Sequence, residues 1–181
     1  MIRWFGIVFA KLIAKLFYDQ KYLKGKYFED TDMGWRFILR CFFDQKILGK
    51  NRIVGFPING SSVLSNPNRI HFHVDDINNF QSFGCYFQNF SGDIYIGRGS
   101  YIAPNVGIIT SNHDLTDLDK HLPGKDVVLG EKCWIGMNSV ILPGVILGNG
   151  TIVAAGSVVT RSFEEGSCVI GGTPAKLIKK M

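Results

Sequence analysis

The sequence predicts a parallel β-helix as the main part of the chain, and three observations support this fold class. An aliphatic residue recurs every six positions, a small or β-branched residue follows four positions later, and glycine or alanine often follows directly. A period of six fits neither an α-helix nor a long alternating strand. It fits a chain that runs extended, turns and runs again. Each such coil needs neighbours above and below to bury its apolar edge, so the coils stack.

The longest run of the repeat keeps one phase over six consecutive hits. Its aliphatic positions are Leu129, Ile135, Ile141, Leu147, Val153 and Val159. Its small or β-branched positions are Cys133, Ser139, Val145, Thr151 and Ser157. An earlier run places Ile96, Ile102 and Ile108 in the aliphatic role. We expect aliphatic side chains inside the stack, small ones at crowded corners, and Gly or Asn with positive φ at the turns.

Residues 53–90 predict irregular early coils of the same β-helix. Ile58, Leu64 and Ile70 are also six apart, but they are two residues out of phase with Ile96, so a bulge or loop must intervene. The β-helix domain is therefore predicted to span residues 53–181, with a C-terminal tail at 172–181.

Residues 1–52 show no repeat and are predicted to form a helical extension that caps the open end of the stack. Residues 1–18 fit an amphipathic helix, whose longest uncharged run is too short to span a bilayer. Its polar side carries Arg3, Lys11 and Lys15, blurred by Trp4 and Ile7, and its apolar side carries Phe5, Phe9, Leu12, Ile13 and Leu16. We favour packing of the apolar side on the rest of the protein or on another subunit. The second interpretation is peripheral contact with a membrane surface.

Composition and charge narrow the function classes. Hydrophobic residues make up 46% of the chain and charged residues 19%, which is typical of a folded domain. The net charge of +5 arises mainly from the first 52 residues and the C-terminal tip, without any nucleic-acid-binding motif, so no nucleic-acid partner is expected. Four separate cysteines, Cys41, Cys85, Cys133 and Cys168, form neither a zinc motif nor a disulfide framework, which favours a cytoplasmic location.

The repeat breaks between Ile108 and Leu129, and the polar residues 110–126 predict a loop that projects from the stack. A loop held by a rigid scaffold is a suitable place for catalytic groups. His113 lies near its start, and a neutral imidazole can take a proton from an attacking hydroxyl or amine. His121 is interpreted as a surface residue, while His71 and His73 are interpreted as structural. No metal site is expected.

Three segments in the second half of the chain resemble a known protein family. They are NHDLTD at 112–117, VVLGEKCWIGMNSVILPGVILGNGTIVAAGSVVTRSF at 127–163 and VIGGTPAKLIKK at 169–180. They resemble the hexapeptide-repeat O-acetyltransferases, and most of all those that act on sugars, capsules and exopolysaccharides. The resemblance covers about half of the chain, from Gly84 to the C-terminus. It implies a left-handed parallel β-helix of triangular section, a homotrimer with active sites between subunits, and acetyl-CoA as co-substrate.

The resemblance also implies roles for individual residues. His113 matches the catalytic base. The positions that match coenzyme-binding residues are Trp134, which lines the tunnel, Ala155 and Thr160, near the pantetheine arm, and Lys176 and Lys179, near the phosphates. The two lysines are three apart, so a helical turn would put them on one side. The acceptor-side pattern of the family is not cleanly matched, and Asn89, Ser91 and Asp114 are the nearest polar candidates.

These observations together predict transfer of an acetyl group from acetyl-CoA to a hydroxyl of a sugar or of a surface-polysaccharide precursor. One alternative is N-acetylation of an amino sugar or an antibiotic. Another is a non-catalytic β-helix, or one with a metal site in which His71 or His73 joins His113 and His121. A cytoplasmic enzyme with peripheral contact at the inner face of a membrane fits the predicted acceptor.

Overall fold

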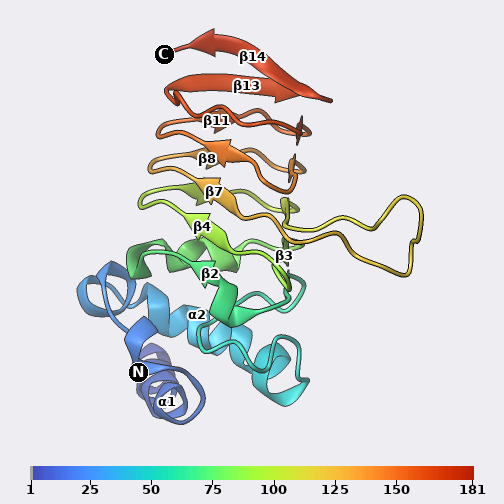
Figure 1. The fold of residues 1–181 in the computed structure, drawn as a ribbon. Helices are drawn as coiled ribbons and strands as arrows, with labels where there is room; N and C mark the ends of the chain where they lie inside the picture. The colour runs from blue at the N-terminus through green and yellow to red at the C-terminus, as the bar shows by residue number, and fades with distance from the viewer. Residues whose placement is uncertain (1) are drawn as a thin grey trace.

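A computed structural model describes residues 2–181, with side chains from Phe5 onward. The predicted roles of the Arg3 and Trp4 side chains therefore lie outside the described residues. Helices occupy one end of the molecule, and coils of β-strand stack from there to the C-terminus (Figure 1). The predicted fold class, a left-handed parallel β-helix with a helical N-terminal extension and a projecting loop, is confirmed.

Three sheets form the sides of the stack. The first contains β1 (Val63–Leu64), β3 (Tyr86–Gln88), β6 (Gly107–Ile109), β9 (Val140–Ile141) and β12 (Val158–Val159). The second contains β2 (Ile70–His71), β4 (Ile94–Ile96), β7 (Val127–Leu129) and β10 (Ile146–Leu147). The third contains β5 (Tyr101–Ile102), β8 (Trp134–Ile135), β11 (Ile152–Val153), β13 (Cys168–Gly172) and β14 (Ala175–Lys180). Strands pair in parallel, except that β14 returns antiparallel to β13.

The core confirms the repeat. Every aliphatic residue from Ile96 to Val159 that was assigned to the interior is buried, and so are the small residues four positions later. Several of the small residues are Ser or Thr because their hydroxyls donate to backbone carbonyls at the corners. The Ser139 hydroxyl donates to the Ala154 carbonyl at 3.0 Å, and the Thr151 hydroxyl donates to the Gly148 carbonyl at 2.7 Å.

The turns follow the same period. A left-handed residue occurs three positions after seven of the nine aliphatic ones, at Gly99, Asn105, Lys132, Asn138, Gly144, Gly150 and Gly156. Lys132, at φ 55°, is the departure from the expected Gly or Asn. Gly136 shows why glycine often follows the aliphatic residue: a Cβ there would lie 2.6 Å from the Ala155 nitrogen of the next coil.

The early coils are irregular, as predicted. Ile70 pairs with Ile94 rather than Ile96, which accounts for the two-residue difference in phase. The 3-10 segment η5 (Val74–Gln81) replaces a strand below β5. The buried Asn79 side chain takes over the missing ladder bonds, because it donates to the Ser100 carbonyl and accepts from the Ile102 amide, both at 2.9 Å.

The N-terminal extension is helical and shares its core with the first coils. It contains α1 (Ile2–Phe17), η1 (Gln20–Tyr22), η2 (Lys26–Asp30), α2 (Met33–Phe42) and η3 (Phe43–Ile47), and η4 (Pro67–Arg69) lies further on. Aromatic rings join the two parts, with Phe56 4.6 Å from Phe80 and 5.0 Å from Tyr22 between ring centroids. The division of the chain at residues 52 and 53 stays a prediction.

Helix α1 packs on the rest of the chain through only part of its predicted apolar side. It packs on the protein through Ala10, Ile13 and Ala14, whose small side chains allow close approach. Of the predicted apolar side, Ile13 alone is buried, whereas Phe5, Phe9, Leu12 and Leu16 are exposed. Packing on the rest of the same chain therefore does not bury Phe9, Leu12 or Leu16, and packing of this side on another subunit stays a prediction.

Candidate functional site

The projecting loop leaves the stack between β6 of the first sheet and β7 of the second (Figure 1). Paired residues of successive coils are 18 positions apart after the loop, as in Val140 with Val158, but 33 apart across it, as in Gly107 with Val140. The loop thus adds 15 residues to one coil without changing the register of the sheets. The projecting loop of the predicted fold class is therefore present between β6 and β7, and its bounds at 110–126 stay a prediction.

The loop is a two-stranded ribbon rather than an irregular excursion. The Lys125 amide donates to the Thr110 carbonyl, the Leu122 amide donates to the Asn112 carbonyl, and an antiparallel bridge joins His113 to His121. At the tip, the Asp114 carboxylate accepts from the amide and the hydroxyl of Thr116 at 2.7 and 2.6 Å. These bonds lower the pKa of Asp114 below its usual value.

The ribbon fixes the orientation of the His113 ring. Its Nδ1 lies 2.7 Å from the Leu118 carbonyl oxygen. A carbonyl can only accept, so Nδ1 carries the proton of the neutral ring and Nε2 keeps its lone pair. The His121 ring lies against it, with centroids 4.2 Å apart, and Phe90 contacts His121 edge-on at 5.0 Å. His113 is exposed in the single chain, and the contact of Nδ1 with the Leu118 carbonyl holds its ring on the ribbon.

A buried glutamine that the sequence analysis missed anchors the base of the ribbon. Gln88 ends β3, and its side-chain oxygen accepts from the Thr110 and Ser111 amides at 3.0 Å each. Its side-chain nitrogen donates to the Ser111 carbonyl at 3.0 Å. The only sequence signal is a polar residue at the end of a strand that the irregular early phase left unassigned.

The three weak acceptor candidates have different surroundings. Asn89 is fully buried, and its side chain bonds to the backbone amide and carbonyl of Asn66 at 2.8 and 2.7 Å, which argues against contact with an acceptor. Ser91 lies beside Gly124 of the ribbon, and its hydroxyl is buried without a hydrogen-bond partner among the described residues. Asp114 uses its carboxylate to stabilise the turn at the tip.

The predicted coenzyme residues lie away from His113 within one chain. Trp134 is on β8 in the third sheet, where 55% of its surface is exposed. Ala155 and Thr160 are exposed at the turns that follow β11 and β12. The ribbon with His113 leaves from the corner between the first and second sheets, so one chain does not bring the base and Trp134 together.

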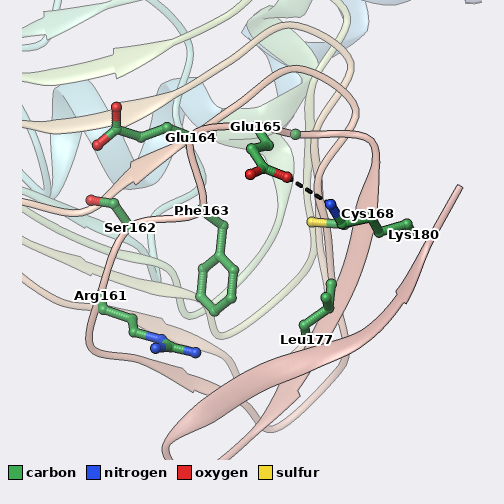
Figure 2. A pocket seen from close by; sticks show the side chains of 9 residues that line it. Arg161, Ser162, Phe163, Glu164, Glu165, Cys168, Leu177 and Lys180 are labelled. Atoms are coloured by element: carbon green, nitrogen blue, oxygen red, sulfur yellow. Dashed lines mark hydrogen bonds and ion pairs between the residues drawn. The ribbon is translucent and has the colours of Figure 1, made fainter.

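A hollow of about 500 Å³ lies at the C-terminal end, between β14 and the turn at 161–166. Figure 2 shows Arg161 and Phe163 on one side of it and Leu177 and Lys180 on the other. Lys180 forms an ion pair with Glu165 at 2.9 Å, which lowers the pKa of Glu165 and raises that of Lys180. Arg161 directly follows the predicted Thr160, and it too was missed by the sequence analysis.

The expected helical turn at the C-terminus is wrong. Lys176 and Lys179 lie on β14, opposite Gly171 and Val169, and a bulge interrupts the pairing between them. Neither lysine lines the hollow beside Arg161. Their predicted proximity to coenzyme phosphates therefore depends on a strand at the end of the stack rather than on a helix face.

The four cysteines are free and buried. Burial raises the pKa of the Cys133 thiol, which keeps it protonated and a poor nucleophile. The histidines of the alternative metal site make other contacts. His71 stacks on Tyr95, and the His73 ring accepts a hydrogen bond from the Asp75 amide at the start of η5. In residues 5–181, no three His, Cys, Asp or Glu side chains are grouped closely enough to hold a metal ion.

Comparison with known proteins connects this architecture to acetyl transfer. The family model described as bacterial transferase hexapeptide (six repeats) matches residues 126–161. A protein of Saccharomyces cerevisiae that is named an acetyltransferase is 41% identical over 92 residues, which cover 49% of this chain and 46% of that protein. An Escherichia coli protein named for O-acetyl transfer in lipopolysaccharide biosynthesis is 39% identical over 99 residues, covering 48% and 50%. The chain thus spans about half the length of the curated relatives it matches.

Two solved structures share the architecture. A galactoside acetyltransferase in complex with coenzyme A has a TM-score of 0.52 and 26% identity, covering 66% of this chain and 62% of its own. A hexapeptide-repeat acetyltransferase of Vibrio cholerae in complex with acetyl-CoA has a TM-score of 0.50 and 26% identity, covering 66% and 68%. The hexapeptide repeat and the similarity to O-acetyltransferases, both expected from the sequence, are confirmed.

Proposed function

We propose that this protein transfers an acetyl group from acetyl-CoA to a hydroxyl of a sugar or of a surface-polysaccharide precursor, with His113 as general base. The observation that carries the proposal is the 2.7 Å contact of His113 Nδ1 with the Leu118 carbonyl, which orients the ring and makes Nε2 the nitrogen with the lone pair in the neutral form. The similarity to proteins named for O-acetyl transfer in lipopolysaccharide and colanic acid biosynthesis supports the choice of acceptor.

The proposed reaction is a direct transfer of the acetyl group from coenzyme A to the acceptor. Nε2 of His113 takes the proton of the acceptor hydroxyl while the hydroxyl oxygen attacks the thioester carbonyl carbon. The carbonyl oxygen becomes an oxyanion, which a backbone N–H of the coenzyme groove would stabilise. The C–S bond then breaks, the ester forms, and the imidazolium returns its proton to the departing thiolate of coenzyme A.

A covalent acyl-enzyme is not needed for this chemistry. Cys133 precedes Trp134 and is the thiol nearest in sequence to the proposed coenzyme groove, but it is buried and its pKa is raised. A protonated thiol in the core cannot attack a bound thioester. The acceptor hydroxyl therefore remains the attacking group.

The site needs a second copy of the chain. His113 and Trp134 leave the stack from different sides, and each is exposed. Leucines make the ribbon tip apolar, with 93% of the Leu115 surface exposed, and Tyr101 and Trp134 lie side by side on the third sheet. A homotrimer places the ribbon of one copy against the third sheet of the next, completing three equivalent sites and covering these apolar surfaces.

The proposed contacts of Lys176 and Lys179 with the phosphates of coenzyme A can be tested by substitution. We expect Lys176→Gln and Lys179→Gln each to raise the Kd for acetyl-CoA by between about tenfold and 100-fold, since a hydrogen bond to a charged group contributes about 1.5–3 kcal/mol. Neither change should affect binding of acetyl-pantetheine, which lacks the nucleotide. Isothermal titration calorimetry measures both affinities.

The matched control is Lys24→Gln, an exposed lysine of the N-terminal extension. It should leave both affinities unchanged. Equal losses for acetyl-CoA and acetyl-pantetheine would mean that the lysines support the fold of β14 rather than bind phosphate, and this outcome would refute their proposed role.

A further inference from the structure

Helix α1 presents an apolar stripe to solvent. It consists of Val8, Phe9, Leu12 and Leu16, and its exposed fractions rise along the helix to 60% at Leu12 and 72% at Leu16. The spacing of four between Val8, Leu12 and Leu16 places them on one side of the helix. The opposite side, with Ala10, Ile13 and Ala14, holds the helix against the core. We call the exposed residues the α1 stripe.

The α1 stripe is part of an apolar end of the molecule. Segment η3 lies at the same end of the stack (Figure 1). In η3 and the residues that follow it, Phe43, Ile47, Leu48 and Ile53 are exposed. The terminal cap of a solenoid normally has a polar outer face, because nothing stacks beyond it. Exposed apolar residues gathered on one end therefore indicate a binding surface.

The charge at this end identifies the partner. Residues 1–52 contain 11 Lys and Arg against 5 Asp and Glu, a net charge of +6, whereas residues 53–181 carry −1. Lys11 and Lys15 are exposed on α1 next to the stripe, and Lys11 lies over the Trp35 ring at 5.3 Å. A second copy seated on the stripe would bring two such basic ends together. An anionic surface would instead attract them.

We propose that the α1 stripe docks on an anionic lipid bilayer. In this arrangement α1 lies in the plane of the membrane, with Phe9, Leu12 and Leu16 at the boundary of headgroups and acyl chains. Lys11 and Lys15 contact lipid phosphates at the edge of the stripe. In the described part of the chain, none of the helices has the length and apolarity needed to cross a bilayer, so this contact is with the surface only.

Vesicle flotation of the full chain tests the proposal. The protein should float with phosphatidylcholine vesicles that contain phosphatidylglycerol, less with phosphatidylcholine alone, and less at high salt. Lys11→Gln and Lys15→Gln should each weaken partitioning by about fivefold. The double variant Leu12→Ser and Leu16→Ser should weaken it by about tenfold or more. The control is the double variant Leu177→Ser and Ile178→Ser, which changes exposed residues at the other end of the stack. It should leave partitioning to the vesicles unchanged.

Three results would overturn the proposal. One is the absence of flotation with anionic vesicles, and another is flotation that the stripe substitutions leave unchanged. The third is a lower molecular mass of the Leu12→Ser and Leu16→Ser variant in light scattering, which would assign the stripe to a second copy. Because these residues are exposed, the variant should keep the circular dichroism spectrum and melting temperature of the parent.

Discussion

Replacing His113 with alanine is expected to lower kcat for acetyl transfer by between about 100-fold and 10,000-fold, the usual contribution of a positioned general base. The Kd for acetyl-CoA should stay within about twofold, because His113 lies on the ribbon and the proposed coenzyme residues lie on the third sheet and at the turns. Steady-state release of the coenzyme A thiol gives kcat, and calorimetry gives the Kd. The contrast between the two separates a chemical role from a binding role.

The matched control is His71→Ala, an exposed histidine of β2 on the second sheet. It removes a ring of the same kind that packs on Tyr95, and it should leave kcat unchanged. Full turnover by the His113→Ala variant would exclude His113 as the base. A large fall in both variants would indicate that histidine loss damages the fold rather than the chemistry.

Gln88→Ala is expected to lower the free energy of unfolding by about 2–6 kcal/mol, because the buried amide and carbonyl of Ser111 each lose a partner at about 1–3 kcal/mol. It should also lower kcat at a temperature where the protein remains folded, since the ribbon that carries His113 is anchored through these bonds. Urea unfolding at fixed protein concentration measures the stability, and hydrogen exchange at Thr110 and Ser111 measures the loosening.

Gln20→Ala provides the comparison, because Gln20 is exposed and makes a single long contact of 3.4 Å with the Tyr18 carbonyl. Its stability should stay within about 0.5 kcal/mol of the parent, as is usual for surface positions. Unchanged amide exchange at Ser111 in the Gln88→Ala variant would show that other bonds of the ribbon suffice to anchor it.

Much of the fold could be predicted because the hexapeptide pattern records the geometry of one coil. The buried aliphatic residue, the small residue at the corner and the left-handed turn residue each recur with a period of six residues within the regular coils between Ile96 and Val159. The interval between Ile108 and Leu129 is not a multiple of six, and this break in the period located the loop. The period could not locate Asn79 or Gln88, since these side chains replace backbone bonds at irregular positions where no repeat exists.

The rest could not be predicted because it depends on neighbours that are distant in sequence. A helical wheel of α1 gives the apolar side but not which part of it meets the core, and small Ala10 and Ala14 are buried in preference to large Leu12 and Leu16. Lys176 and Lys179 lie in a strand because β13 offers an open edge to pair with. The contact of His121 with His113 requires a ribbon turn that shows no periodicity.

Acceptor-dependent release of coenzyme A from acetyl-CoA, measured over a panel of sugars and amino sugars, tests whether this protein is an acetyltransferase. We predict thiol release with a sugar acceptor by the parent protein, loss of that release in the His113→Ala variant, and a product ester that mild base removes. An amide product would show that the acceptor is an amine rather than a hydroxyl. Failure to bind acetyl-CoA, or equal release with and without His113, would contradict the account.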